Sequence, residues 1–540
     1  MPSNGKRSWY TNLPKPGLPA HHQTRPAIAG LLIALSMLAC SLGARGSTDP
    51  IFTPPNGLAP QSTLPTPSLD ASASLVSNIP PATVDAPTLI PTITNTPLPT
   101  ASPTISAPYL YYTQAGDTLP VVAIRFGVKP SEITSPNPLP ATSLLPPKQL
   151  LVIPRRLANT TSSQHLLPDS EVVFSPSAMD FDVAAFVKKA NGYLASYGSF
   201  INNGGELSGS DVIIRVAKDN SINPRLLLAL LEFQSGWVYG QPGNLAQTVY
   251  PMGMIDMSRG GLYNQLMWAV SQISVGYYGW REGLLTEITF PDGVKARLAP
   301  DLNAGTVALL YYFAKVYDAQ TWAKATDLNH GLAALHERMF GNAWVRAIGV
   351  EPLYPPDLAQ PPLILPFLVN QLWSFTGGPH GAWEHEGALA ALDFAPGSTE
   401  SGCVKSDSWE VAVAAGKVVR SEYGIVVLDL DGDGYEQTGW DILYLHVASD
   451  GRVAAGTWVE KGDLIGHPSC EGGEATGTHL HIARKYNGEW IPADGPIPFN
   501  LDGWIAHAGP QPYIGTLTKG DQTVTASQYG SFESNIRRIP

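Results

Sequence analysis

Half of the residues between Ser41 and Pro108 are proline, threonine or serine, 34 of 68. The same stretch contains no lysine, and Arg45 is its only arginine. A segment of this composition cannot bury enough apolar surface to offset the entropy that is lost on ordering. We therefore predict a disordered, extended stalk over residues 41–108, so that any folded domains lie in the chain that follows it.

The first 40 residues have the pattern of a bacterial export signal. Basic residues precede an apolar run, Ala27–Ala39, whose 13 residues are too few for a transmembrane helix of about 20. The run ends in Met37-Leu38-Ala39-Cys40, which resembles the lipobox of bacterial lipoproteins. This resemblance implies a signal peptide over 1–40 and a membrane anchor through a lipid on Cys40. An ordinary cleaved signal, with secretion, and a retained anchor are the alternatives.

The overall composition narrows the class of protein. A chain of 540 residues should hold three or four domains. Its net charge of −12 argues against a nucleic-acid binder, which would present a basic face. Three cysteines are present, and if Cys40 carries a lipid, Cys403 and Cys470 are free to pair in an exported protein. Two unrelated reduced thiols are the alternative.

Residues 109–155 predict a small module. They contain Y-Y-T-Q-A-G-D-T-L at 111–119, F-G-V at 126–128 and a closing strand, L-V-I-P, at 151–154. Gly116 and Asp117 turn the chain out of a strand, and Asp117 or Thr118 can cap a helix that begins at Leu119. The segment resembles the LysM module, a βααβ fold that binds N-acetylglucosamine-containing glycans. A small αβ unit of another kind is the alternative.

Residues 175–350 have a helical pattern. Asn223 and Pro224 give a helix start, and leucines follow at helical spacing over 226–231. The stretch from Ser221 to Val238 resembles the catalytic helix of lysozyme-like transglycosylases, and Met252-Gly253-Met254 resembles their second motif. The aromatic residues Tyr277, Tyr278 and Trp280 could stack on sugar rings, although aromatic residues in such a pattern more often form core.

The catalytic acid of that helix is missing. The lysozyme-like family places it directly before the serine, where this chain has Gln234 before Ser235. A glutamine amide cannot deliver a proton to a leaving glycosidic oxygen. Glu232 lies two residues earlier, about 200° around the helix, and points almost the opposite way. We therefore predict a non-catalytic domain that binds glycan or acts as a spacer. An active glycosidase using Glu232 or another acid, and an unrelated helical domain, are the alternatives.

A proline-rich linker, 351–366, separates the helical region from a segment of strand-like character, 367–509. The candidate strands are short, β-branched or alternating, and are separated by Gly or Asp turns. They are Val411–Val419, Gly424–Leu430, Asp441–Val447 and His479–Ala483. This pattern predicts an all-β domain. The remaining residues, 510–540, are expected to form a polar tail.

Histidines in this domain have the spacing of metal ligands. His380 ends the motif G-G-P-H, Asp393 is the centre of L-D-F, and His446 ends Y-L-H. In T-H-L-H, His479 and His481 should lie on one face of a strand because side chains alternate. Two imidazoles and a carboxylate suit a zinc site with three protein ligands and an open fourth position.

Together these motifs, with C-E-G-G-E-A-T-G-T-H-L-H at 470–481, resemble the beta-lytic and staphylolytic metallopeptidases, relatives of lysostaphin. Members of this family are exported zinc endopeptidases that cut peptide bridges in peptidoglycan. The resemblance implies an antiparallel sandwich, or barrel-sandwich, with a duplicated hybrid motif. It also implies one zinc ion held by His380, Asp393 and His481. His479 and His446 become the non-ligand catalytic pair, of which we favour His479 as the general base.

The spacing between the first two candidate ligands refines which branch of the family this chain resembles. The common lysostaphin pattern has its first ligand four residues before the aspartate, where this chain has Leu389. The interval from His380 to Asp393 fits the longer insert of the beta-lytic branch, and His385 is the rival first ligand. Thr478 stands where the family usually has proline.

A second cation site is conceivable at Asp429-Leu430-Asp431-Gly432-Asp433-Gly434, which resembles the start of a calcium loop. The twelfth position is Trp440, where an EF-hand needs a bidentate glutamate. We therefore expect a polar hairpin turn, with calcium held by Asp429, Asp431 and Asp433 as the alternative.

These inferences combine into one hypothesis, a monomeric zinc metalloendopeptidase at the bacterial cell surface. Its partners would be peptidoglycan, through the LysM-like module and the zinc site, and the membrane, through the lipid on Cys40, with no nucleic acid. The rivals are a non-enzymatic peptidoglycan-binding scaffold or activator, and a glycan-strand hydrolase that acts through the middle domain.

Overall fold

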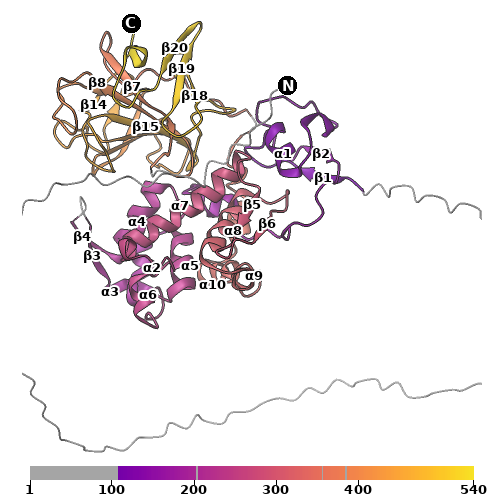
Figure 1. Cartoon of the computed structure of the whole chain (residues 1–540). Helices are drawn as coiled ribbons and strands as arrows, with labels where there is room; N and C mark the ends of the chain where they lie inside the picture. The colour runs from indigo at the N-terminus through magenta and orange to yellow at the C-terminus, as the bar shows by residue number, and fades with distance from the viewer. Residues whose placement is uncertain (1–106, 202–204, 356, 384–385) are drawn as a thin grey trace, which may run out of the picture. The chain divides into compact units, whose positions relative to one another are not determined.

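The computed structural model describes residues 107–540 apart from 202–204, 356 and 384–385 (Figure 1), and these residues belong to the same unit of the chain. The predicted export signal, the lipid on Cys40 and the stalk lie outside the described residues. Among the helices that are described, none combines the length and apolar composition that crossing a bilayer requires.

The N-terminal module pairs two antiparallel strands, β1 (Tyr109–Tyr112) and β2 (Leu150–Ile153), beside one helix, α1 (Leu119–Phe126). Helix α1 ends at Gly127, whose left-handed backbone (φ 66°) terminates it. The second helix of a βααβ module is reduced here to the three-residue 3₁₀ helix Pro130–Glu132. Prolines at 136, 138 and 140 would interrupt a longer helix. The LysM resemblance therefore stays a prediction.

The middle region is helical, as predicted. Helix α5 (Pro224–Ser235) begins where the sequence signal places it: the Asn223 side chain accepts the N–H of Arg225, and Pro224 occupies the first turn. Leucines 226–228, 230 and 231 are fully buried, so α5 is enclosed on all sides. The other helices and two small hairpins are α2 (Val183–Ala190), α3 (Tyr193–Ser196), β3 (Gly198–Ile201), β4 (Gly205–Ser208), α4 (Gly209–Asn220), α6 (Leu245–Val249), α7 (Leu262–Arg281), β5 (Glu287–Thr289), β6 (Lys295–Arg297), α8 (Ala304–Val316), α9 (Ala319–Ala325), α10 (Leu332–Phe340) and α11 (Ala343–Ala347).

Side chains singled out in the middle region have structural partners. The aromatic residues Tyr277, Tyr278 and Trp280 are buried in the core, which agrees with the core interpretation rather than sugar stacking. Gln234 donates to the Tyr312 hydroxyl (3.0 Å). Glu232 accepts the backbone N–H groups of residues 238 and 239 at 2.9 and 3.1 Å.

The C-terminal region is a mostly β domain with antiparallel sheets, which confirms that prediction. Its nine-stranded sheet has the order β13-β10-β11-β12-β15-β8-β7-β21, with β16 paired to β15. Smaller sheets are β14-β9 and β17-β18-β19-β20. The strands are β7 (Leu372–His380), β8 (Ala391–Pro396), β9 (Glu410–Val411), β10 (Gly416–Glu422), β11 (Ile425–Asp429), β12 (Trp440–Leu445), β13 (Trp458–Val459), β14 (Leu464–Gly466), β15 (Leu480–Tyr486), β16 (Glu489–Trp490), β17 (Asn500–Leu501), β18 (Trp504–Ala508), β19 (Gly515–Lys519), β20 (Gln522–Thr525) and β21 (Asn535–Arg537).

Two segments differ from expectation. The stretch 510–540, expected to be a polar tail, forms β19 and β20 beside β18, and then β21, which pairs with β7. Apolar and polar residues alternate only weakly in this stretch, because a short strand at a sheet edge buries few side chains. Strand β20, for example, buries only Val524. The linker 351–366 is also packed, with Leu353 and Leu365 each 1% exposed, because its apolar residues fill gaps between larger elements.

The helical region and the sheet share one core. On β12, Ile442 and Tyr444 enter the core inside the β domain, whereas Leu443 and Leu445 join the cluster that contains the leucines of α5. Alternating side chains thus give this strand two buried faces. The two regions are therefore not independent domains joined by a hinge, as the proline-rich linker had suggested.

Buried charges connect the same two regions. Arg281, on α7, lies 2.9 Å from a carboxylate oxygen of Glu489 on β16 and 3.0 Å from one of Asp169. Arg420, on β10, pairs with Asp219 on α4 and with Glu436. Charges buried in this way are stable only while each keeps its partners.

Replacing Arg281 with methionine should lower the free energy of unfolding by about 3–5 kcal/mol. The substitution keeps much of the side chain's apolar stem but leaves the carboxylates of Glu489 and Asp169 buried without their cation. Denaturant titration of the full chain measures the effect, with Arg338→Met, at an exposed position, as the matched control. Equal midpoints for both variants would contradict the prediction.

Candidate metal centre

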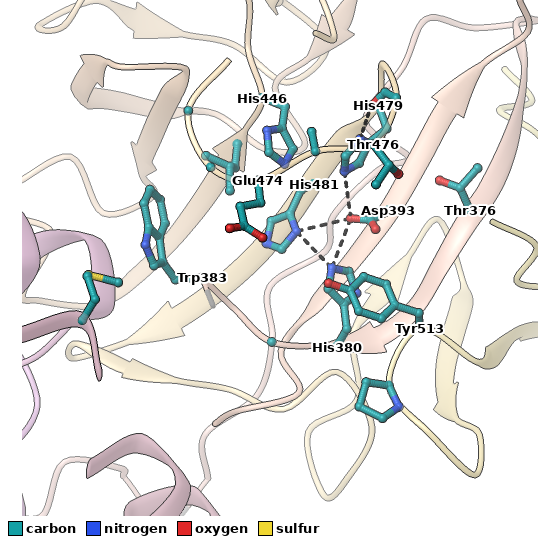
Figure 2. A pocket seen from close by; sticks show the side chains of 18 of the residues that line it. Thr376, His380, Trp383, Asp393, His446, Glu474, Thr476, His479, His481 and Tyr513 are labelled. Carbon is teal, nitrogen blue, oxygen red and sulfur yellow. Dashed lines mark hydrogen bonds and ion pairs between the residues drawn. The ribbon is translucent and has the colours of Figure 1, made fainter. Parts of the chain in front are cut away.

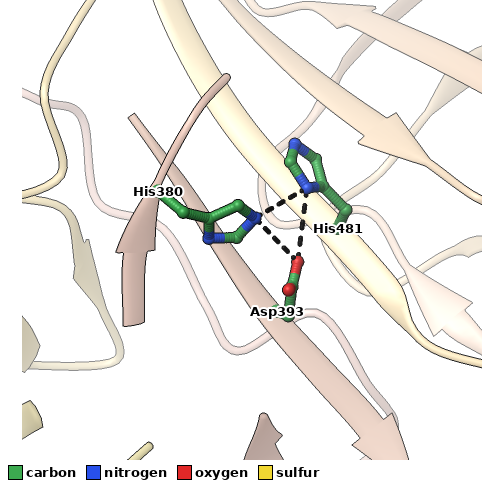
Figure 3. A group of neighbouring side chains, drawn as sticks. All are labelled: His380, Asp393 and His481. Carbon is green, nitrogen blue, oxygen red and sulfur yellow. Dashed lines mark hydrogen bonds and ion pairs between the residues drawn. The ribbon is translucent and has the colours of Figure 1, made fainter. Parts of the chain in front are cut away.

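Three neighbouring strands bring the predicted ligands together (Figure 3). His380 ends β7, Asp393 lies in β8 and His481 lies in β15. Asp393 is directly opposite His481 in the strand register and opposite Gly377 on its other side. Register shifts in β7 between residues 375 and 380 re-aim the end of that strand, so that His380 reaches the same point.

The ligand atoms converge closely. The Nε2 atom of His380 lies 3.0 Å from Nδ1 of His481, and these atoms are 3.2 and 3.3 Å from Oδ1 of Asp393. All three residues are buried. Oδ1 of Asp393 has no hydrogen-bond donor in the described structure. A buried oxygen with no donor, facing two imidazole nitrogens, is an arrangement that a cation satisfies.

The outer nitrogens of both histidines orient the rings. Nδ1 of His380 lies 2.8 Å from the carbonyl oxygen of Gly378, and Nε2 of His481 lies 2.9 Å from that of Ala382. A carbonyl only accepts, so each of these nitrogens carries the proton and the inner nitrogens present lone pairs. Burial lowers the pKa of His481, which favours the neutral ring. Burial acts to raise the pKa of Asp393, but His380 and His479 hold it well below its usual range. The donor set fits zinc.

The two non-ligand histidines lie beside the ligands, facing the same cleft (Figure 2). The ring centres of His446 and His479 are 4.5 Å apart, and Nε2 of His479 is 3.8 Å from Oδ1 of Asp393. Each ring donates through Nδ1 to a backbone carbonyl, that of Glu471 or Gly477, at 2.9 and 2.7 Å. Both Nε2 atoms are therefore proton acceptors.

His446 occupies a constrained position. Burial, with the adjacent rings of His479 and His481, lowers the pKa of His446 to about 3. Its backbone is left-handed (φ 69°), a conformation that costs energy for a non-glycine residue. The N–H and the hydroxyl of Ser469, both at 2.7 Å from the His446 carbonyl, hold it there.

The chain around the His479–His481 strand is cross-linked. A disulfide joins Cys403 and Cys470, with a Cα–Cα distance of 5.8 Å. Next to it, Thr478 donates its N–H to the carbonyl of Gly402 (3.1 Å), and its hydroxyl accepts the N–H of Val404 (2.9 Å). A proline at 478 could make neither bond, so threonine here ties the strand that carries two site histidines to the disulfide-bonded loop.

Other predicted residues do not join this site. The carboxylates of Asp429, Asp431 and Asp433 offer oxygen atoms within 4.8 Å of one another. Asp429 accepts the N–H groups of Asp431 and Gly432, each at 3.0 Å, which is the polar turn that the sequence predicts. Calcium binding at this turn stays a prediction. The rival ligand His385 lies outside the described residues.

Tyr513 is a site residue that the sequence did not indicate. Its ring stacks on His380, with centres 4.1 Å apart and planes 21° from parallel. Its carbonyl accepts the N–H of Gly378 at 2.8 Å. Tyr513 belongs to the stretch that was expected to be a tail. The only feature of the sequence that could have indicated a role for it is an aromatic residue in a polar stretch.

The glycines of G-G-P-H make room for the site. A Cβ added to Gly377 would lie 2.4 Å from Oδ2 of Asp393, and one added to Gly378 would lie 2.6 Å from the backbone nitrogen of Gly515. Both distances are shorter than van der Waals contact, so a side chain at either position would displace a neighbour.

Replacing Gly377 with alanine should weaken zinc binding by roughly 10- to 100-fold, the effect typical of disturbing the residues that orient a ligand. Competition against a chromogenic zinc chelator measures the affinity. The control is Gly397→Ala, since a Cβ there meets nothing within 4 Å. Zinc affinity equal to that of the control would show that Asp393 tolerates the methyl group.

Comparison with known proteins identifies relatives of this chain. A family model described as the N-terminal domain of LasA matches residues 165–355. Protease LasA of Pseudomonas aeruginosa is 27% identical over 285 residues in strain UCBPP-PA14 and 28% over 286 in strain PAO1. Each match covers 51% of this chain and 65% of the relative, so the chain spans just under two thirds of its relatives' length. The middle region's resemblance to lysozyme-like enzymes stays a prediction, since the matching model names another family.

Solved structures are similar to smaller parts of the chain. The deep-sea M23 metalloprotease Pseudoalterin is 21% identical, with a TM-score of 0.26, over 31% of this chain and 96% of that one. The lysostaphin catalytic domain of Staphylococcus simulans is 22% identical, with a TM-score of 0.17, over 22% of this chain and 87% of that one. The sequence matches to Protease LasA, together with the ligand motifs, support the resemblance of this chain to the lysostaphin-like zinc metallopeptidases.

Proposed function

We propose that the protein is a zinc metalloendopeptidase that hydrolyses peptide bonds of bacterial peptidoglycan. The observation that carries the proposal is the convergence of His380, Asp393 and His481 at a cleft that also holds the acceptor nitrogens of His446 and His479. The cleft has a volume of about 1530 Å³, enough for a peptide. The relatives that match in sequence carry the name protease.

A zinc ion at these ligands would supply a Lewis acid that lowers the pKa of water from 15.7 to about 7. The protein's own groups would then move the proton. His479 is the better base, because its side chain is 18% exposed and Asp393 lies close enough to stabilise the charged ring. His446 is buried, so a positive charge on its ring is disfavoured. It would steady the oxyanion only if its Nε2 carried a proton.

Mass analysis of digested peptidoglycan tests this function. The full chain, loaded with zinc, is incubated with purified sacculi. We expect fragments with new amino and carboxyl termini, which disappear on chelation and return when zinc is added. New reducing sugar ends would instead indicate the glycan-strand hydrolase, and intact sacculi with bound protein would indicate the scaffold. Either of these outcomes overturns the proposal.

The remaining parts would hold the enzyme on its substrate. In this proposal the module at 109–155 binds glycan, the helical region assists it, and a lipid on Cys40 anchors a monomer at the cell surface. Leu110 and Tyr112, 65% and 60% exposed on β1, support a sugar-binding surface. Tethering a catalytic site beside its polymer raises the effective substrate concentration. Replacing Leu110 and Tyr112, which are exposed, with serine should weaken binding to sacculi without altering cleavage of a soluble peptide.

A further inference from the structure

The cleft at the metal centre has two walls of different origin. The C-terminal domain supplies the histidines and the loop at 472–478, whereas the helical region supplies residues of β3, α4, the loop at 258–261 and the start of α7. The shared core and the buried ion pairs fix these regions to each other. The helical region is thus part of the cleft, not only a neighbour of it.

The two walls differ in charge. Among the described residues that line the cleft, the carboxylates are Asp393 and Glu474, both from the C-terminal domain. The arginines are Arg215, on α4, and Arg259, in the loop before α7, both from the helical region. A peptide lying along this cleft would meet the metal centre on one side and two guanidinium groups on the other.

Arg215 is held in place by its surroundings. Its side chain is only 10% exposed. The guanidinium carbon lies 4.3 Å from the ring centre of Tyr423, and Nε lies 3.5 Å from a carboxylate oxygen of Asp219. A planar, stacked guanidinium loses little freedom when it binds an anion.

The charge of Arg215 is only partly balanced. Asp219 also pairs with Arg420, so one carboxylate serves two guanidinium groups. Nε and Nη1 of Arg215 are buried and make no hydrogen bond in the described structure. The side chain nevertheless lines the cleft. A fixed cation that shares its counter-charge and lines a cleft is suited to binding an anionic group.

We infer that the helical region forms an anion-binding wall of the substrate cleft, in which Arg215 binds a free carboxylate of the peptide and Arg259 adds attraction from the exposed rim. The ligand class is a peptide that carries a terminal carboxylate or an acidic side chain away from the bond that is cut. The inference rests on the proposed function, because it names a feature of the same substrate.

The test uses zinc-loaded full chain and three fluorescent five-residue stem peptides: one with a glutamate and a free carboxyl terminus, one with glutamine in place of that glutamate, and one amidated at its terminus. Fluorescence anisotropy gives the affinity and product analysis gives the cleavage rate. We expect the first peptide to bind roughly 10- to 100-fold more tightly than one of the amide forms, as a hydrogen bond to a charged group implies.

Variants locate the source of that preference. Arg215→Gln should abolish it through KM, leaving kcat within about threefold, because the interaction lies away from the reacting bond. Arg259→Gln should reduce the preference for the acidic peptide by a smaller factor. Because Arg259 is exposed, this substitution does not disturb the core. Arg338→Gln is the matched control on α10 and should leave the preference unchanged. If Arg215→Gln fails to fold by circular dichroism, Arg215→Met, which keeps the apolar stem but removes the charge, and Arg259→Gln carry the test.

The outcomes separate the two proposals. Equal binding of all three peptides by the unmodified chain overturns the anion-binding wall. A preference that survives in Arg215→Gln, or in both Arg215→Met and Arg259→Gln if Arg215→Gln does not fold, overturns it as well. Selective binding of the acidic peptide with no cleavage of any peptide supports the wall and overturns the proposed peptidase. Cleavage of all three peptides at one rate with one KM supports the peptidase and overturns the wall.

Discussion

Replacing His481 with alanine, or Asp393 with asparagine, should reduce peptidoglycan cleavage by about 10³-fold or more. Each change removes one of three ligands, and the metal's contribution to the reaction is several kcal/mol, where 1.36 kcal/mol corresponds to a factor of ten in rate. The asparagine keeps the shape of the aspartate but removes its charge from a site in which Oδ1 accepts no hydrogen bond from any described residue. Digestion of sacculi measures the rate, and elemental analysis measures the bound zinc.

The matched control for the ligand variants is His507→Ala. His507 lies on β18, in the same domain, and hydrogen-bonds to Thr518 away from the cleft. It should keep both zinc and activity. Full cleavage by the His481 or Asp393 variant would contradict this assignment of the metal centre, and so would a normal zinc content in both.

Replacing His479 or His446 with alanine should reduce cleavage by about 10²- to 10⁴-fold while the zinc content stays normal, because neither residue is a ligand. The proton acceptor of each ring is Nε2, since Nδ1 donates to a carbonyl. Loss of the ring therefore removes proton transfer but leaves the three ligand atoms in place.

Glutamine variants separate the roles of the two histidines. A glutamine amide can donate a hydrogen bond to an oxyanion but cannot accept a proton at neutral pH. If His479 is the base, His479→Gln should be as inactive as His479→Ala. If His446 steadies the oxyanion, His446→Gln should recover part of the activity that His446→Ala loses. The reverse pattern, with recovery only at position 479, would exchange the two assignments.

Local sequence patterns predicted some features well. The start of α5 was predictable because Asn223 and Pro224 act within one helical turn. The family was recognised from G-G-P-H and T-H-L-H because the same residues that hold a metal must recur at the same spacing. Strand alternation predicted that His479 and His481 lie on one side, since the period of a strand is a local property, and both residues line the cleft in the structure.

Long-range features were not predictable from local patterns. The stretch 510–540 reads as polar because its strands are short and two of them, β20 and β21, lie at sheet edges, yet β21 pairs with β7 of the main sheet and Tyr513 stacks on His380. The linker 351–366 reads as a hinge because it is rich in proline, yet its apolar residues are buried. In both cases the deciding contacts join residues more than a hundred positions apart.

The sequence by itself predicted the chemistry: which side chains form the candidate metal site, and which family the chain resembles. Those properties depend on residue identity and short spacing. Only the tertiary structure decided what surrounds that chemistry. It placed two arginines of the helical region among the residues that line the cleft of the candidate metal centre, and it gave β12 two buried faces. The physical reason is that packing and buried charge pairing are cooperative, so the partner of Arg281 or Arg420 is set by the whole fold and not by its neighbours in the chain.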